Sequence, residues 1–155
     1  MNKNYIDSDK LNALMTEVVA ARDGKNTLPT SKEEYLGCIT IELSSTWAAS
    51  SLLDNYDEYV KPAIEEHFAN AMILILNMAW DVHGEKMRWY GYDHYGLGFS
   101  SKKSFAENLW IFTQYVLNWG VMNITDSVAF IYAWAEHYDK DPETLDDYIR
   151  QKIKI

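Results

Sequence analysis

The chain has 155 residues, of which 48% are apolar and 24% charged, a balance typical of a globular domain rather than a disordered one. Its formal net charge of −9 argues against a surface that coats long nucleic acid. Acidic proteins do bind single nucleotides when a Mg²⁺ ion lies between their carboxylates and the phosphates. The single cysteine, Cys38, excludes an internal disulfide, and no Cys/His cluster indicates a zinc site.

Neither the amino-terminal residues nor the longest apolar stretch indicates a segment that enters a membrane. The amino-terminal residues lack the apolar run of a signal peptide. The longest apolar stretch, residues 68–80, is interrupted by Asn70 and Asn77 and is too short to span a bilayer. We therefore expect a cytoplasmic protein with no membrane partner.

Caps and apolar periodicity predict helices in the amino-terminal half, and no segment alternates for long in the manner of a strand. The first helix begins after Asp7 or Ser8 and stops at Gly24. The second begins at a capping box, with Ser31 as the N-cap and Glu34 reaching back, and runs to about residue 53. A loop through residue 29 connects these two helices.

The third helix is predicted to lie at the centre of the domain. An acidic, tyrosine-bearing linker, residues 54–59, precedes Pro62, which suits the first turn of a helix. The helix continues to His83 and ends at Gly84, and residues 68–80 are apolar nearly all round.

Residues 85–101 form a glycine-punctuated aromatic loop, a length that is more often functional than not. Its rings, Trp89 among them, could stack on a nucleobase, or they could cover the end of a helical bundle. Three helices follow: one from about 103 to 119, one from about 125, and one opened by Asp141 as N-cap and closed by Lys152. We expect a single all-α domain, residues 1–155, built as a bundle of about five to six helices.

Polar residues interrupt the apolar surfaces of the second and third helices, and we call this set the polar seam. It consists of Cys38, Glu42 and Ser45 on the second helix, and of Glu66, Asn70, Asn77 and Asp81 on the third. Because buried polar groups cost several kcal/mol without partners, the seam must be satisfied by itself, by a ligand or ion, or by a second subunit. Asn residues at this spacing also fix the register of packed helices, and a glutamate can pair with a cation of another helix. Cys38 is predicted to be a small core residue.

Two segments of the seam resemble a known superfamily. Residues 41–45, Ile-Glu-Leu-Ser-Ser, and residues 65–79, from Glu65 to Ala79, are similar to the core of the all-α nucleoside triphosphate pyrophosphatases, which include MazG and the dimeric dUTPases. The hallmark of that superfamily is ExxE on one helix and ExxD on the next, which together hold Mg²⁺ against the triphosphate. Residues 141–152 likewise resemble its last helix with a YxxxK element, here Tyr148 and Lys152.

The chain departs from this pattern at most of the acidic positions. Glu42 keeps the first acid, whereas Ser45, His67 and Asn70 stand where the second, third and fourth acids are expected. Asn77 replaces a further Asp of many members. Glu66 lies one residue early, which turns its side chain about 100° around the helix. A single carboxylate among neutral groups holds Mg²⁺ poorly, so the fold is expected to persist while hydrolysis is weakened.

The resemblance implies a homodimeric helical protein that binds a nucleotide or related phosphate compound, with weakened or absent pyrophosphohydrolase activity. One alternative is an active Mg²⁺-dependent enzyme that recruits Glu66, Asp81, Glu107 or Asp126 to a rebuilt metal site. The other is a non-catalytic homodimer or regulatory protein whose seam is interfacial. The expected metal ligands are Glu42 and Glu66. The expected ligand-binding residues are Glu42, Ser45, Glu66, His67, Asn70, Asn77, Trp89 and Lys152.

Overall fold

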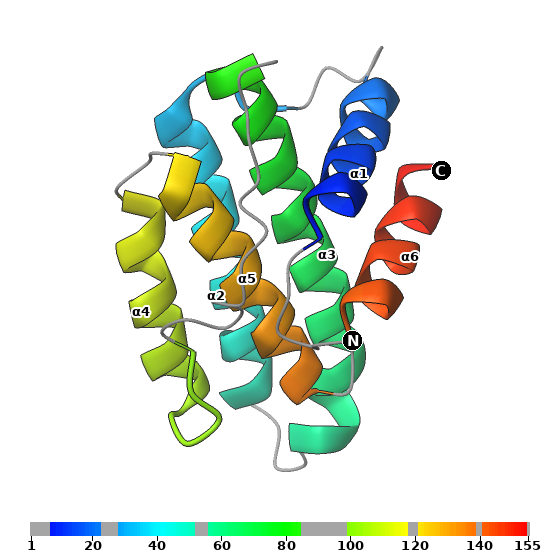
Figure 1. Ribbon diagram of the computed structural model, residues 1–155. Coiled ribbons are helices and arrows are strands. Elements are labelled where there is room, and N and C mark those ends of the chain that lie inside the picture. Colours follow the sequence, from blue (N-terminus) through cyan, green and yellow to red (C-terminus); the bar gives the residue numbers. More distant parts are fainter. Residues whose placement is uncertain are drawn as a thin grey trace.

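The protein was analysed as a computed structural model, which describes residues 7–22, 28–51, 56–84, 99–117, 121–138 and 141–154. Side chains are described for these residues except 46–51, 56–64, 115–117 and 121–123. Within these ranges the chain forms helices and no strand, as predicted (Figure 1). The helices are α1 (Ser8–Ala21), α2 (Lys32–Ser51), α3 (Tyr56–His83), α4 (Phe105–Leu117), α5 (Val121–His137) and α6 (Pro142–Ile153).

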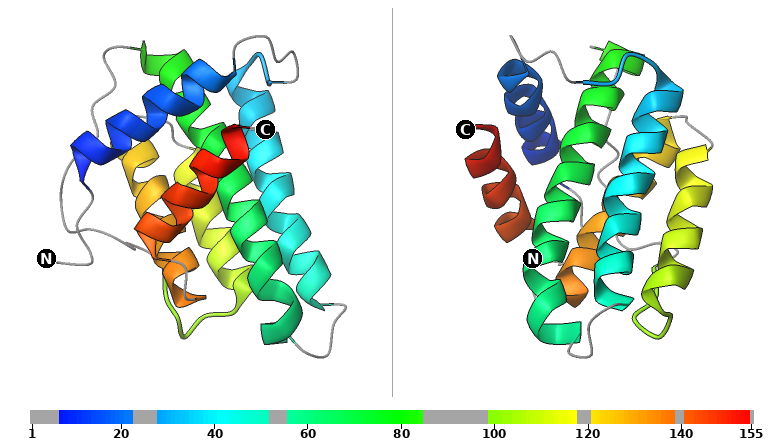
Figure 2. Two further views of the ribbon diagram at one scale, coloured as in Figure 1. Left: turned by 90° about the vertical axis from the view of Figure 1, so that its right-hand side faces the viewer. Right: turned by 180° about the vertical axis from the view of Figure 1, so that it is seen from behind.

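Helix α3 runs through the middle of the bundle, as its apolar pattern predicts. It contacts α1, α2, α5 and α6, and α4 closes the far side by packing on α2 and α5. Figures 1 and 2 show α1 and α6 together on one side of α3, with α2 and α4 on the other. No helix in the described ranges is long and apolar enough to cross a membrane.

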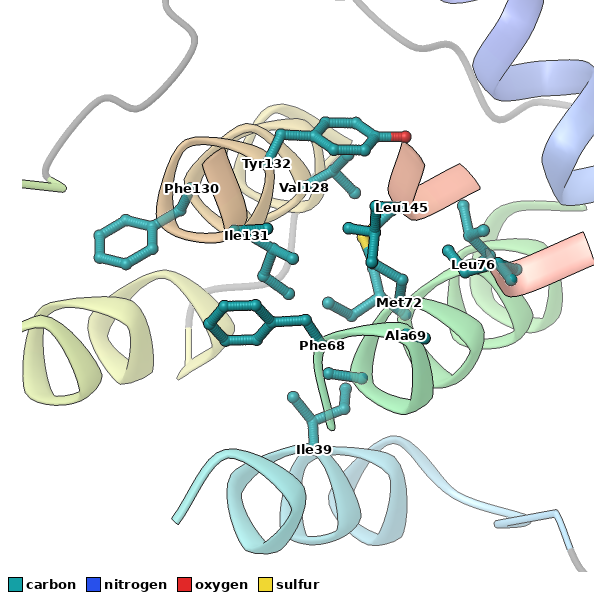
Figure 3. Packing of buried hydrophobic residues seen from close by; sticks show 14 of the residues in the cluster. Ile39, Phe68, Ala69, Met72, Leu76, Val128, Phe130, Ile131, Tyr132 and Leu145 are labelled. Atoms are coloured by element: carbon teal, nitrogen blue, oxygen red, sulfur yellow. The ribbon is translucent and has the colours of Figure 1, made fainter. Parts of the chain in front are cut away.

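The core lies between α3 and the helices that surround it (Figure 3). Phe68 points from α3 toward Ile131 of α5, while Ile39 of α2 approaches α3 from the opposite side. All three side chains are fully buried. Burial of this apolar surface makes the main favourable contribution to the free energy that holds the helices together.

Three helix starts confirm the capping residues read from the sequence. The Asp7 carboxylate accepts hydrogen bonds from the backbone N–H groups of residues 9 and 10 at 3.0 and 3.1 Å. Ser31 Oγ accepts from the Glu34 N–H at 3.2 Å, and Glu34 reaches back to the N–H of Thr30. The Asp141 carboxylate accepts from the N–H of residue 144 at 2.8 Å. Each cap satisfies backbone donors that the first helical turn leaves without partners.

The predicted starts of α3 and α5 are wrong by several residues. Helix α3 begins at Tyr56, so Pro62 lies inside the helix and not in its first turn. Helix α5 begins at Val121, four residues before the predicted start at about residue 125. Proline inside a helix removes one backbone hydrogen bond and its ring clashes with a carbonyl of the preceding turn, a cost of about 3 kcal/mol that the packing of a long helix can outweigh.

The start of α4 is held by a buried asparagine and a capping box. Asn108, which is 3% exposed, donates from Nδ2 to the Ser100 carbonyl at 3.0 Å and accepts from the Ser100 N–H at 3.2 Å. Ser104 Oγ accepts from the Glu107 N–H, and the Glu107 carboxylate accepts from the Ser104 N–H. These bonds fix the direction in which α4 leaves the preceding turn.

Candidate functional site

In the folded chain, polar-seam residues of α2 and α3 are found in three separate clusters. In each cluster they form hydrogen bonds with other residues of the same chain. The first, the α2–α3 cluster, consists of Glu42, His67 and Asn70. Asn70 Nδ2 donates to Glu42 Oε1 at 2.7 Å, and His67 Nδ1 lies 2.8 Å from the same oxygen. The side chains of Glu42 and His67 are each 25% exposed, so the pair is partly shielded from water.

The contact with Glu42 in the α2–α3 cluster determines which nitrogen of the His67 ring faces the carboxylate with a hydrogen. A carboxylate has no hydrogen to donate, so Nδ1 of His67 must donate to Glu42. The other ring nitrogen, Nε2, is therefore either the acceptor of a neutral ring or the second donor of an imidazolium. In the second state His67 would offer a positive charge at the place where the superfamily pattern has an acid.

The second set, the α3–α6 cluster, joins Glu66 to the carboxy-terminal helix. Lys152 Nζ donates to Glu66 Oε1 at 2.5 Å, and the Tyr148 hydroxyl donates to Glu66 Oε2. Lys152 is 25% exposed and Glu66 43%. The cluster brings together residues that are 82 and 86 positions apart in the sequence.

The hydrogen bonds of the α3–α6 cluster shift the pKa values of its members. The hydrogen bond from Lys152, followed by that from Tyr148, holds the pKa of Glu66 below its usual range. The bond to Glu66, aided by burial, raises the pKa of Tyr148 to about 12. The charge of His67 also contributes to lowering the pKa of Glu66, so the first two clusters interact electrostatically across α3.

The third set, the α1–α3 cluster, consists of Arg22, Tyr35, Asn77 and Asp81. Arg22 NH1 donates to Asp81 at 2.7 Å and to Asn77 Oδ1 at 3.4 Å. Tyr35 donates its hydroxyl hydrogen to the other oxygen of Asp81 at 2.7 Å. Asn77 is 1% exposed and also donates to the Ile73 carbonyl at 3.0 Å. These contacts tie three helices together, a structural role that the sequence analysis left open for Asn77.

Three other residues named in the sequence analysis do not join these clusters in the described structure. Ser45 is exposed on α2 and donates its hydroxyl hydrogen to the Ile41 carbonyl, a common bond within a helix. Cys38 is exposed, so its prediction as a core residue is wrong; it lies on the solvent side of α2, one residue before the buried Ile39. Trp89 lies outside the described residues.

The side chains in these clusters do not suit a magnesium ion. Mg²⁺ requires nearly octahedral coordination by hard oxygen ligands. Glu42 already accepts hydrogen bonds from His67 and Asn70, and Glu66 from Lys152 and Tyr148, so these donors would have to leave before a metal ion could bind the carboxylates. Among the residues with described side chains, no three His, Cys, Asp or Glu come together in a group that could hold a metal ion.

Sequence reasoning missed Arg22 and Tyr35, the two partners of Asp81. Arg22 follows the last turn of α1, and Tyr35 lies in the first turn of α2, 59 and 46 positions before Asp81. A basic residue at a helix end is ordinarily explained by the helix dipole. Only the packing of α1 beside α3 shows that this arginine donates hydrogen bonds to the buried amide of Asn77 and to the carboxylate of Asp81.

Asp146 links α6 to α5, and its environment predicts a measurable pH dependence of stability. It accepts from the Tyr132 hydroxyl at 2.7 Å, but burial raises its pKa from 3.8 to about 6. Between these two values the folded chain binds more protons than the unfolded chain, so this group lowers stability as the pH rises. Asp146→Asn should therefore stabilise the protein by about 1–3 kcal/mol at pH 7 and by much less at pH 4.

Urea unfolding of both chains at pH 4 and pH 7 measures this difference, and comparison with the wild type removes the contribution of every other titrating group. A variant that is less stable than the wild type at pH 7 would contradict the effect. That outcome would mean that attraction to Arg150 outweighs the cost of burial.

No family model, curated protein or solved structure matches the chain.

Proposed function

We propose that the protein binds a nucleotide or a related phosphate compound where α2, α3 and α6 meet, with weakened or absent pyrophosphohydrolase activity. In this proposal the chain is a divergent relative of the all-α nucleoside triphosphate pyrophosphatases. The binding residues are His67 and Lys152, of which Lys152 supplies positive charge in place of a metal ion.

The observation that carries the proposal is the α3–α6 cluster. The resemblance to the superfamily involves two segments, the acidic segment of α3 and the YxxxK element of α6. Their separation in the sequence does not by itself predict that they are in contact. Both residues that define that element, Tyr148 and Lys152, contact Glu66 of the acidic segment. This contact is what a shared site would require.

The loss of hydrolysis follows from the partners of the two glutamates. Metal-dependent hydrolysis needs an ion that activates water and offsets the charge of the phosphates. Here the carboxylates that would bind it already accept hydrogen bonds from His67, Asn70 and Lys152. The alternative of a rebuilt metal shell gains no support from Glu107, which caps α4, or from Asp81, which is held by Arg22.

Phosphate binding then requires a change of partner at Lys152. Its ammonium group is bound to Glu66, with both side chains partly exposed to water. Ion pairs of this kind contribute only about 0–1 kcal/mol, so a dianionic phosphate can compete for the lysine. A protonated His67 on the neighbouring face of α3 would add a second donor.

Thermal melts against ribo- and deoxynucleoside mono-, di- and triphosphates, each with Mg²⁺ and with EDTA, test the proposal. A ligand at a hundred times its dissociation constant adds about 2.7 kcal/mol of stability. We expect one class of compound to produce this shift in EDTA, without release of pyrophosphate. A shift that appears only with Mg²⁺ and is accompanied by pyrophosphate release would favour the active enzyme instead.

A second candidate function, non-catalytic assembly as a homodimer, is favoured by a separate observation. Trp110 is 68% exposed on α4, and large aromatic side chains at the surface are enriched where proteins associate. The polar seam is the less suitable interface, because the described members of its three clusters have partners within the chain.

A further inference from the structure

The α2–α3 cluster holds His67 in an orientation that leaves one ring nitrogen available. Its Nδ1 atom donates to Glu42 Oε1 at 2.8 Å, and Asn70 donates to the same oxygen at 2.7 Å. Asn70 thus fixes the carboxylate, and the carboxylate fixes the imidazole ring. Nε2 of His67 makes no hydrogen bond to any described residue and is not enclosed in the core. In the neutral ring, with the hydrogen on Nδ1, Nε2 carries an accessible electron pair.

The other two histidines that the structure describes do not share this arrangement. Nε2 of His83, at the end of α3, is buried without a hydrogen-bond partner. His137, at the end of α5, is exposed and packs its ring against Phe99 and Tyr138. A carboxylate at one nitrogen and an accessible electron pair at the other is the arrangement that orients the histidine of a Ser-His-Asp triad for chemistry at Nε2. His67 is therefore the described histidine best placed to react.

His67 also lies beside the lysine of the proposed phosphate site. It follows Glu66 in α3, and the two side chains are turned about 100° apart around the helix axis. Glu66 faces α6, where Lys152 donates to it at 2.5 Å, whereas His67 faces α2. Figure 2 shows α3 between these two helices, which contact α3 but not each other within the described ranges. A phosphate that replaces Glu66 at Lys152 is thus one residue away from the imidazole along α3.

We propose that Nε2 of His67 accepts a phosphoryl group from a phosphate compound held by Lys152, forming a phosphohistidine without a metal ion. The electron pair of Nε2 forms the new bond to phosphorus, and the bond from phosphorus to its leaving group breaks. The leaving group departs with the electrons of that bond, as ammonia from phosphoramidate or as a phosphate oxygen anion from a phosphoanhydride. Nδ1 keeps its hydrogen, so the ring becomes positively charged.

Glu42 stabilises the product of this step. The positive charge on the ring lies beside Glu42 Oε1, 2.8 Å from Nδ1, where both side chains are partly shielded from water and opposite charges attract more strongly. Lys152 meanwhile offsets the negative charge of the transferred group. Because Glu42 also occupies Nδ1, only Nε2 is open to phosphorus. Phosphorylation must therefore give a single ring isomer.

This reaction rests on the phosphate site proposed above and adds a covalent step to it. Transfer of a terminal phosphoryl group releases no pyrophosphate, so the step needs none of the metal-dependent hydrolysis that the site lacks. Thermal melts with inorganic phosphate measure binding separately, since inorganic phosphate carries no good leaving group. A chain that binds phosphate but forms no phosphohistidine would refute the covalent step alone, whereas a chain with no phosphate shift would refute the site.

Incubation of the full chain with phosphoramidate in EDTA, followed by intact-mass measurement and phosphorus NMR, tests the step. We expect one acid-labile phosphoryl group per chain, on Nε2 of His67, and inorganic phosphate should compete with its formation. His67→Gln should abolish the label. Its thermal shift with inorganic phosphate should persist with at most about a tenfold loss of affinity, because only one neutral hydrogen bond is removed.

Three further variants separate the roles of the neighbouring groups. Glu42→Gln should slow labelling about a hundredfold, the loss expected when the partner of a reacting histidine is removed. Lys152→Met should slow it by weakening the binding of phosphoramidate. His137→Gln is the matched control, because it removes an exposed histidine outside the cluster, and it should be labelled at the wild-type rate. Label spread over several histidines, label on Nδ1, or a rate unchanged by Glu42→Gln would overturn the proposal.

Discussion

Replacement of Trp134 by alanine is expected to lower the free energy of unfolding by about 3–5 kcal/mol, the largest effect of any substitution considered. The side chain is 1% exposed and lies where α3, α4 and α5 meet. Its ring centroid is 4.6 Å from that of Phe105, 5.0 Å from Phe68 and 5.5 Å from Phe130. Truncation removes a large buried surface and leaves a cavity that these rings cannot fill by small movements.

Chemical denaturation, read by circular dichroism, measures this loss. For a chain of this size it corresponds to a fall in Tm of about 6–20 °C. Trp110→Ala provides a control of identical chemistry at an exposed position, measured in dilute protein so that association does not contribute. Its effect should stay within about 0.5 kcal/mol. Equal losses for the two variants would contradict the arrangement of the core.

Two substitutions in the α3–α6 cluster are expected to change phosphate affinity in opposite directions. Lys152→Met removes the ammonium group proposed to hold the phosphate, a charge-assisted bond worth about 1.5–3 kcal/mol, so affinity should fall about tenfold to a hundredfold. Glu66→Gln removes the carboxylate that competes for this lysine and repels the ligand. It should tighten binding by about threefold to tenfold.

The opposite signs separate this mechanism from metal binding, because a metal site would lose affinity when Glu66 becomes neutral. Lys154→Met and Glu33→Gln are matched controls that remove the same charges from exposed positions outside the cluster. Both should bind with wild-type affinity. Weakened binding by Glu66→Gln would contradict the proposed role of Lys152 and favour a carboxylate that holds Mg²⁺.

The helical fold could largely be predicted from local signals. Asp7, Ser31 and Asp141 mark helix starts because their side chains satisfy nearby backbone donors, and this depends only on adjacent residues. The start of α3 could not be found in this way. Proline suits a first helical turn, and nothing local shows that tertiary packing extends the helix beyond Pro62.

The site could be predicted only in part. Glu42 and Asn70 lie on facing sides of two helices joined by a short linker, and the structure brings them within 2.7 Å. The contact of Glu66 with Lys152 spans 86 residues and depends on how α6 crosses α3, which no local pattern fixes. The exposed position of Cys38 was missed because a local signal, the residue type, was misleading. Its small apolar side chain resembles a core residue, although it lies one position off the buried face.

We have proposed that the chain binds a phosphate compound through Lys152 and His67 and without metal-dependent hydrolysis. The most direct measurement is calorimetric titration of the wild type with the compound that gives the largest thermal shift, first in EDTA and then in Mg²⁺, followed by an assay for pyrophosphate. We expect binding in EDTA, similar affinity in Mg²⁺ and no pyrophosphate. Binding that requires Mg²⁺ and ends in pyrophosphate release would contradict the account.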